Sequence, residues 1–269
     1  MFSKTDFQAW GKQNAVLFAA VMTKIDGRKD DELLRTYEFT GFPSMAILAA
    51  DGEAITKSVP RDLYSMSNIV AAAPAYAKLS AADEAGDEVD QKQWLMARLG
   101  MGMIKAEEAN ELIASTGISG EMKTKAEGMA FVLEMGELSG SVRGRGVTAE
   151  DKMAACEAVY EAFKAGKRLP DGCSAEAFVD DMLIDAAKSS KDKAAFAHAY
   201  ERVKARHVEQ VETMKGYLPQ YEADLVKNKD DEKLLERTKG TLKRIGEIIG
   251  EAEKKIAELD ATAKELKVG

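Results

Sequence analysis

The chain of 269 residues contains few of the residues on which redox and metal chemistry depend. It has two cysteines and no Cys-x-x-Cys motif, so it lacks the dithiol pair that thiol–disulfide exchange of the thioredoxin kind requires. Its two histidines, His198 and His207, do not have the i, i+4 spacing that places two metal ligands on one helix face. We therefore expect neither a metal site nor a bound cofactor.

Long apolar runs are also missing. The longest is Ala15–Met22, which is far shorter than the roughly 20 residues of a membrane-spanning helix. Residues 1–80 contain nine Lys and Arg against nine Asp and Glu, whereas the remainder contains 29 against 37, so the net charge of −8 belongs to the second part. An acidic surface disfavours phosphate-rich partners. We expect no nucleic-acid partner and no membrane span, and the start of the chain has no signal-peptide pattern.

The segment from Asp30 to Ile55 has the pattern of a short helix, a strand headed by proline, and a hairpin. The helical spacing ends at Pro43, which lacks an N–H group and forces Phe42 out of the helical region. The apolar run Met45–Leu48 predicts a buried strand, and Asp51-Gly52 predicts the tight turn into a second strand.

This pattern resembles the second half of a domain of the thioredoxin-like superfamily. The resemblance matches Asp6–Asn14 to the second half of the helix after the active site, Ala15–Met22 to a core strand and Pro43 to a cis-proline. It implies an α/β thioredoxin-like domain over residues 1–79. It also implies that Phe42, Pro43 and Ser44 bind an extended peptide from a client protein.

In that family the Cys-x-x-Cys motif precedes the helix matched to Asp6–Asn14, and this chain begins after that point. Three arrangements stay open: the two flanking strands pair directly, another element fills the gap, or the gene product is longer than this chain. The resemblance favours the third. It implies a redox-inactive protein-binding module or, alternatively, a thiol–disulfide oxidoreductase whose N-terminus is missing here, which would then be exported or periplasmic.

The rest of the chain predicts helices only. Ser80–Val89 is small and acidic, as in a linker, and a helical domain is expected over residues 80–190. Helical segments within it are predicted from apolar spacing and from Gly or Ser stop signals at Gln91–Leu99, Ala106–Ser115, Gly120–Gly136, Ala149–Ala165 and Ala175–Ser189.

The last segment, residues 191–269, is expected to be a long helical hairpin or coiled coil. Apolar residues from Leu235 to Leu266 alternate at three- and four-residue spacing over more than four heptads. A looser stripe runs from Val203 to Leu225, with a break expected at Gly216 and Pro219, and residues 228–231 predict a turn. The same seam permits a parallel homodimer. A third interpretation of function follows, in which the protein is a coiled-coil scaffold.

Two cysteines and one histidine are the remaining candidates for chemistry. Cys173 follows Pro170-Asp171-Gly172 at a predicted helix start, where the helix dipole favours a reactive thiolate. The alternative is a cysteine without a chemical role, since no histidine or second cysteine is close in sequence. Cys156 is expected to be a small buried residue, and a Cys156–Cys173 disulfide stays open. His207 falls in the apolar stripe and is expected to pack there.

Overall fold

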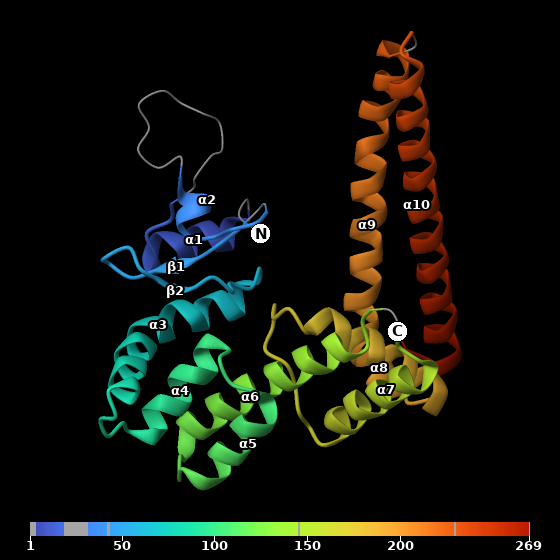
Figure 1. Cartoon of the computed structure of the whole chain (residues 1–269). Helices are drawn as coiled ribbons and strands as arrows, with labels where there is room; N and C mark the ends of the chain where they lie inside the picture. The colour runs from blue at the N-terminus through green and yellow to red at the C-terminus, as the bar shows by residue number, and fades with distance from the viewer. Residues whose placement is uncertain (1–3, 19–31, 42–43, 145, 229, 269) are drawn as a thin grey trace. The chain divides into compact units, whose positions relative to one another are not determined.

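The computed structural model describes residues 4–18, 32–41, 44–144, 146–228 and 230–268. Helices account for 73% of it, and a two-stranded sheet is the only sheet among the described residues. The chain forms two compact units, the first made of Met1–Ser141 with Arg168–Glu176 and the second of Val142–Lys167 with Ala177–Gly269. Figure 1 shows the elements of each unit.

The first unit contains six helices and both strands within its described residues. In chain order they are α1 (Thr5–Asn14), α2 (Leu33–Thr36), β1 (Ile47–Leu48), β2 (Ala54–Thr56), α3 (Leu63–Glu84), α4 (Gln91–Met101), α5 (Ala106–Ser115) and α6 (Gly120–Ser141). The strands pair antiparallel, with Ile47 opposite Thr56. None of the helices in the described parts of the chain is long and apolar enough to cross a lipid bilayer.

The thioredoxin-like α/β domain predicted over residues 1–79 is wrong, and with it the resemblance to that superfamily. The short β1–β2 hairpin is not part of a larger sheet within the described residues. Residues 15–18, expected to begin a core strand, form no strand, and Val16 and Phe18 are 99% and 69% exposed. The physical reason is that turn signals and apolar runs are local, whereas a central sheet needs strands that pair across the chain. The rest of that expected strand, residues 19–22, lies outside the described residues.

The hairpin instead packs on helices. Ile47 and Ile55 pack against a buried cluster formed by Ile69 and Ala73 of α3 and Met101 of α4. A side-chain carbon added at Gly100 of α4 would lie 2.5 Å from the Cβ of Ala72, so the two helices approach too closely there for any larger residue. The expected linker over Ser80–Val89 is also corrected, because α3 continues through Pro74 to Glu84.

A second apolar cluster joins α4, α5 and α6. Its buried members are Leu95, Leu99, Ile104, Ala109, Ile113, Ile118, Ala126, Met129 and Ala130. Polar contacts complete it: Arg98 pairs with Glu108 at 2.7 Å, and the Glu137 carboxylate accepts the Ala106 N–H at the start of α5. The amphipathic helices that the sequence predicted here thus bury their apolar faces against one another.

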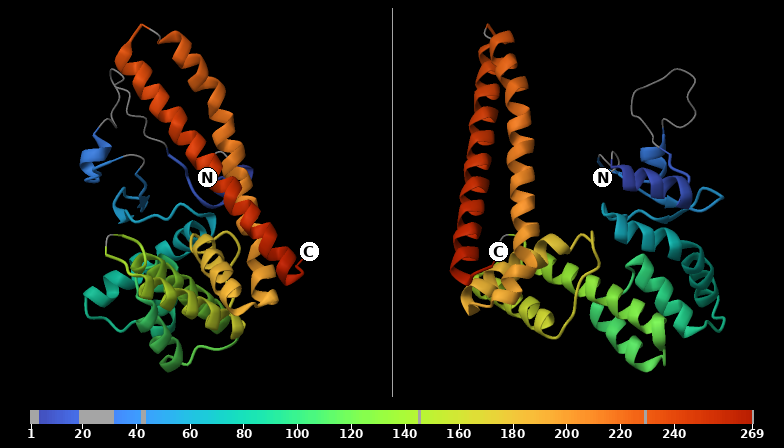
Figure 2. Two further views of the ribbon diagram at one scale, coloured as in Figure 1. Left: turned by 90° about the vertical axis from the view of Figure 1, so that its right-hand side faces the viewer. Right: turned by 180° about the vertical axis from the view of Figure 1, so that it is seen from behind.

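The second unit consists of α7 (Ala149–Lys164), α8 (Glu176–Ser190), α9 (Lys193–Lys227) and α10 (Glu232–Leu266). Thr148 and Asp151 form a capping box that begins α7. Helices α9 and α10 have 35 residues each and lie side by side and antiparallel in all views (Figures 1 and 2). At 1.5 Å per residue each is about 50 Å long. The break expected at Gly216 and Pro219 is absent, since α9 passes through both.

Candidate protein-binding surface

The base of the α9–α10 hairpin is fixed to α8 by a buried carboxylate. Asp180 of α8 is 1% exposed and accepts hydrogen bonds from Arg202 Nε at 3.0 Å, Arg202 Nη2 at 2.7 Å and Arg206 Nη1 at 3.1 Å. Arg206 also pairs with Asp181 at 2.6 Å. Burial raises the pKa of Asp181, while Arg206 and His207 act in the opposite direction. Such bidentate, charge-assisted contacts hold α8 and α9 in one orientation.

A second network joins α9 to α10 near the C-terminal end of α10. The Tyr200 hydroxyl donates to Asp260 Oδ1 at 2.6 Å, and Lys204 Nζ lies 2.7 Å from the same oxygen. The hydrogen bond to Asp260 raises the pKa of Tyr200, and the contacts with Lys204 and Tyr200 lower the pKa of Asp260. Tyr200 therefore stays protonated at neutral pH as the donor to Asp260, and the network joins α9 to α10.

Along the hairpin, α10 buries one row of residues and leaves a neighbouring row partly exposed. The buried row has strict seven-residue spacing and consists of Thr238, Ile245, Ala252 and Leu259. A half-buried row beside it consists of Leu235, Leu242, Ile249 and Ile256. A single partner helix covers only the centre of an apolar stripe, which is why residues next to the seam keep part of their surface.

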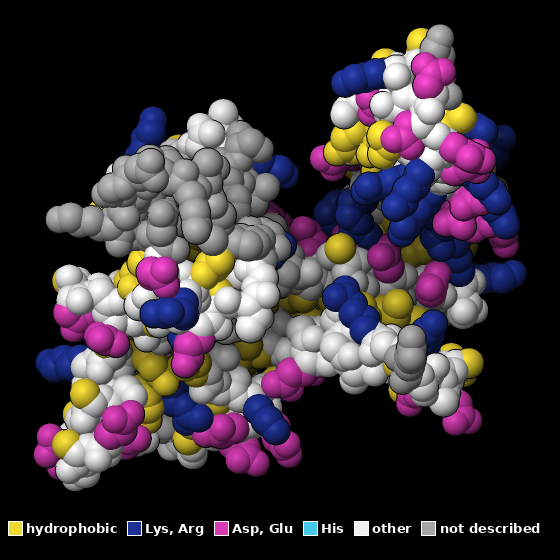
Figure 3. All heavy atoms as spheres, turned by 45° about the horizontal axis from the view of Figure 1, so that its top comes forward, with side chains coloured by type: hydrophobic (Ala, Val, Ile, Leu, Met, Phe, Trp, Pro, Cys, Tyr) yellow, Lys and Arg dark blue, Asp and Glu magenta, His cyan; other side chains and the backbone are white. Residues whose placement is uncertain are grey.

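The distal part of the hairpin is the least covered. The last buried residue of α9 is Val211. Beyond it, Val226 is 73% exposed, Tyr217 is 47% exposed and Leu234 of α10 is 42% exposed. Figure 3 shows hydrophobic side chains between basic and acidic ones over this part of the molecule. Val226 and Leu234 flank the turn between the two helices, so a molecule that covers this turn would remove apolar surface of both from water.

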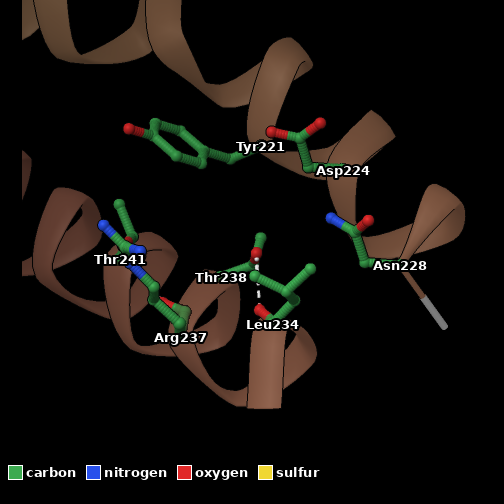
Figure 4. A pocket seen from close by; sticks show the side chains of 7 residues that line it. All are labelled: Tyr221, Asp224, Asn228, Leu234, Arg237, Thr238 and Thr241. Carbon is green, nitrogen blue, oxygen red and sulfur yellow. Dashed lines mark hydrogen bonds between the residues drawn. The ribbon is translucent and has the colours of Figure 1, made fainter. Parts of the chain in front are cut away.

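A pocket of about 230 Å³ lies between the two helices at the tip. Its lining residues are Tyr221, Asp224 and Asn228 of α9 and its C-terminal end, and Leu234, Arg237, Thr238 and Thr241 of α10. Figure 4 shows these side chains on the two sides of the space. The Thr238 hydroxyl is used by the helix itself, since it donates to the Leu234 carbonyl at 2.9 Å. A guanidinium, a carboxylate, an amide and a phenol thus line one space between the two helices.

The resemblance assigned peptide binding to Phe42, Pro43 and Ser44. Phe42 and Pro43 lie outside the described residues, so the expected peptide bond geometry there stays a prediction. Ser44 is exposed, and its hydroxyl donates to the Gly41 carbonyl three residues earlier. With the superfamily assignment withdrawn, no observation supports a peptide-binding role for these three residues.

Both cysteines are free thiols in environments that oppose thiolate formation. Cys173 is 5% exposed, and burial raises its pKa even though the backbone N–H groups of Ala175 and Glu176 act in the other direction. Burial also raises the pKa of Cys156, whose Sγ contacts Met182 Sδ at 3.4 Å. Cys173 precedes α8, so its helix-start position is as expected, but desolvation outweighs the favourable backbone contacts.

The histidines have packing contacts. The ring of His198 lies 5.2 Å from that of Phe163, and His207 is half-buried near Asp181. Among the described residues, no group of three or more His, Cys, Asp or Glu side chains is placed to hold a metal ion.

Sequence reasoning missed the residues that fix the hairpin. Arg202 and Arg206 have the i, i+4 spacing that places both on one face of a helix, which is the only local sign of their shared partner. That partner, Asp180, stands next to Asp181 in the sequence, and nothing local distinguishes the buried carboxylate from the exposed one. Comparison with known proteins adds no relative, because no family model, no curated protein and no solved structure matches the chain.

Proposed function

We propose that this chain is a protein-binding scaffold whose working part is the α9–α10 hairpin. The observation that carries the proposal is the division of the hairpin into a fixed base and an open distal part. Ion pairs and hydrogen bonds hold the base through Asp180 and Asp260, while Tyr217, Val226 and Leu234 remain exposed near the tip.

This division suits recognition because a surface that is ordered before binding loses less conformational entropy on association. The exposed side chains gain from burial about 25 cal/mol for each Å² of apolar area removed from water. The Tyr221–Arg237 pocket supplies polar groups beside them, which adds orientation to an otherwise non-directional contact. A partner protein that covers the tip would use both.

The test places a photo-crosslinking amino acid at Val226, and at Met153 as the control, in the host that encodes the chain. The two residues are matched, being apolar, helical, and 73% and 70% exposed, but Met153 belongs to α7. Irradiation should give discrete protein adducts from position 226 and only background from position 153. Equal adduct patterns from both positions, or none from either, would refute the proposal.

A further inference from the structure

One row of charged residues on α10 takes no part in the hairpin. It consists of Arg237, Arg244, Glu251 and Glu258, which are seven residues apart and therefore share one face of the helix. All four are exposed. The order of charge along the row is two positive residues followed by two negative ones.

The row is almost without partners of its own. Within the described parts of the chain, Arg237, Arg244 and Glu251 form no ion pair, and Glu258 has one contact at the 4.0 Å limit, with Lys254. Members of the row cannot pair with each other, because seven residues rise about 10.5 Å along a helix. By contrast, Glu253 and Asp260 of the same helix reach lysines of α9 at 2.8 Å and 2.7 Å.

Between this row and the buried seam lies a row that is only half covered. Thr241, Ile248 and Lys255 are half-buried, and Leu234 at its end is 42% exposed. Every residue of this row is three or four positions away from a residue of the charged row, and such residues are neighbours on a helix surface. Together they form one long face, partly apolar along its inner edge and charged along its outer edge.

The whole of α10 repeats the pattern of the row. Residues 232–244 contain five Lys or Arg against two Glu, whereas residues 245–260 contain two Lys against five Asp or Glu. A second copy of the same helix running in the opposite direction places each half against its complement. A parallel copy places like charges together, which suppresses that arrangement.

We propose, as one partner of the α9–α10 hairpin whose binding role is proposed above, a second copy of this chain whose α10 packs antiparallel on this face. The two-fold axis passes close to Ile248, so that the two copies of this residue meet at the centre. Arg244 then lies opposite Glu251 of the second copy, and Arg237 lies opposite Glu258 of the second copy. Both pairs are symmetric about the midpoint between residues 247 and 248, and the symmetry forms each pair twice.

Such an interface is isologous and closes on itself, so it gives a dimer and not a filament. It also gives Arg237 of the tip pocket the carboxylate partner that its own chain does not supply within the described residues. Exposed ion pairs are individually weak and are screened by salt, so the dimer should weaken when ionic strength rises from about 0.05 M to about 0.5 M.

The experiment is a charge swap measured by sedimentation velocity on the full chain. Arg244→Glu and Glu251→Arg should each raise the dimer dissociation constant at least about tenfold, and the double variant should return to within about threefold of the wild type. Lys243→Glu is the matched control, because this neighbouring cation is 80% exposed on another face and its reversal should have little effect. Circular dichroism checks that every variant stays folded.

Cysteine crosslinking tests the direction of the helices independently. Ile248→Cys should form a disulfide-linked dimer under mild oxidation, because this residue meets its own copy. Thr241→Cys should not, although the double variant Thr241→Cys/Lys255→Cys should, since these positions are symmetric about Ile248. A parallel dimer would crosslink Thr241→Cys alone and would overturn the proposal.

Other outcomes are equally decisive. A wild-type chain that stays monomeric at low salt up to about 100 µM overturns the second copy as partner. The proposal is also overturned if both single reversals leave the dimer dissociation constant unchanged, or if the double variant does not restore the wild-type value. If the dimer tests fail, crosslinked adducts between position 226 and other proteins would still support the proposed scaffold function. If no such adducts form, the scaffold function is refuted, and the dimer tests are unaffected.

Discussion

Removing the charge of Asp180 gives the sharpest test of how the hairpin is fixed. Breaking a buried ion pair by removing one partner costs about 3–5 kcal/mol when both partners are buried. Here Arg202 and Arg206 keep 41% and 34% of their side-chain surface, so water solvates part of the freed charge. We therefore expect Asp180→Asn to lower the free energy of opening the α8–α9 contact by about 2–3 kcal/mol.

Hydrogen exchange read by mass spectrometry measures this loss locally. A change of about 2–3 kcal/mol corresponds to exchange about 30- to 150-fold faster for the protected amides of α8 and the first half of α9. Asp181→Asn is the control, because Asp181 has one guanidinium partner and a side chain that is 51% exposed. It should cost less than about 1 kcal/mol. Equal effects of the two substitutions would show that Asp180 does not hold α8 to α9.

Three further predictions concern the hairpin and the buried thiol. Leu259 is a fully buried seam residue, and Leu259→Ala should lower the free energy of unfolding, measured with a chemical denaturant, by about 2–5 kcal/mol. Ile249 is half-buried, and Ile249→Ala should lower it clearly less. Equal losses would contradict the assignment of Leu259 to the buried row. Backbone N–H groups at the start of α9 and the Tyr160 hydroxyl lower the pKa of Asp192. The ionised carboxylate therefore adds to the free energy of unfolding above the unfolded-state pKa, near 3.9. This stabilisation is lost as pH falls through the lower folded-state pKa. Unfolding followed from pH 6 to about pH 2 should show this loss, and Asp192→Asn should flatten it. Cys173 should react with iodoacetamide at least about tenfold more slowly in the native chain than in urea, and equal rates would contradict its burial.

Features that depend on neighbours in the sequence were predictable. Helix α5 begins and ends at the residues that its apolar spacing and stop signals indicated, and the turn at Asp51-Gly52 joins two short strands. Apolar heptads from Leu235 onward lie where the structure has α10 packed against α9. Each of these signals acts within a few residues, through helix periodicity or turn geometry.

Features that depend on contacts between distant parts of the chain could not be predicted from the sequence. A local strand signal at Ala15 carried no information about whether another strand lies beside it, and the thioredoxin-like sheet built on that signal is wrong. Pro219 disfavours a helix interior, yet α9 continues through it where the helix is largely exposed. Asp180 illustrates the same limit for the site, because a carboxylate becomes a buried anchor only when a second helix places two guanidiniums against it.

The central claim is that a protein binds the distal hairpin, and the mass of the chain in fresh lysate of its own host tests this most directly. Wild type, Tyr217→Glu/Val226→Glu and the control Met153→Glu are compared by size-exclusion chromatography after replacement of the chromosomal copy. We predict that wild type and the control elute in a complex larger than two copies of the 29.2 kDa chain and that the tip variant elutes as a smaller species. Identical elution of all three proteins would contradict the account.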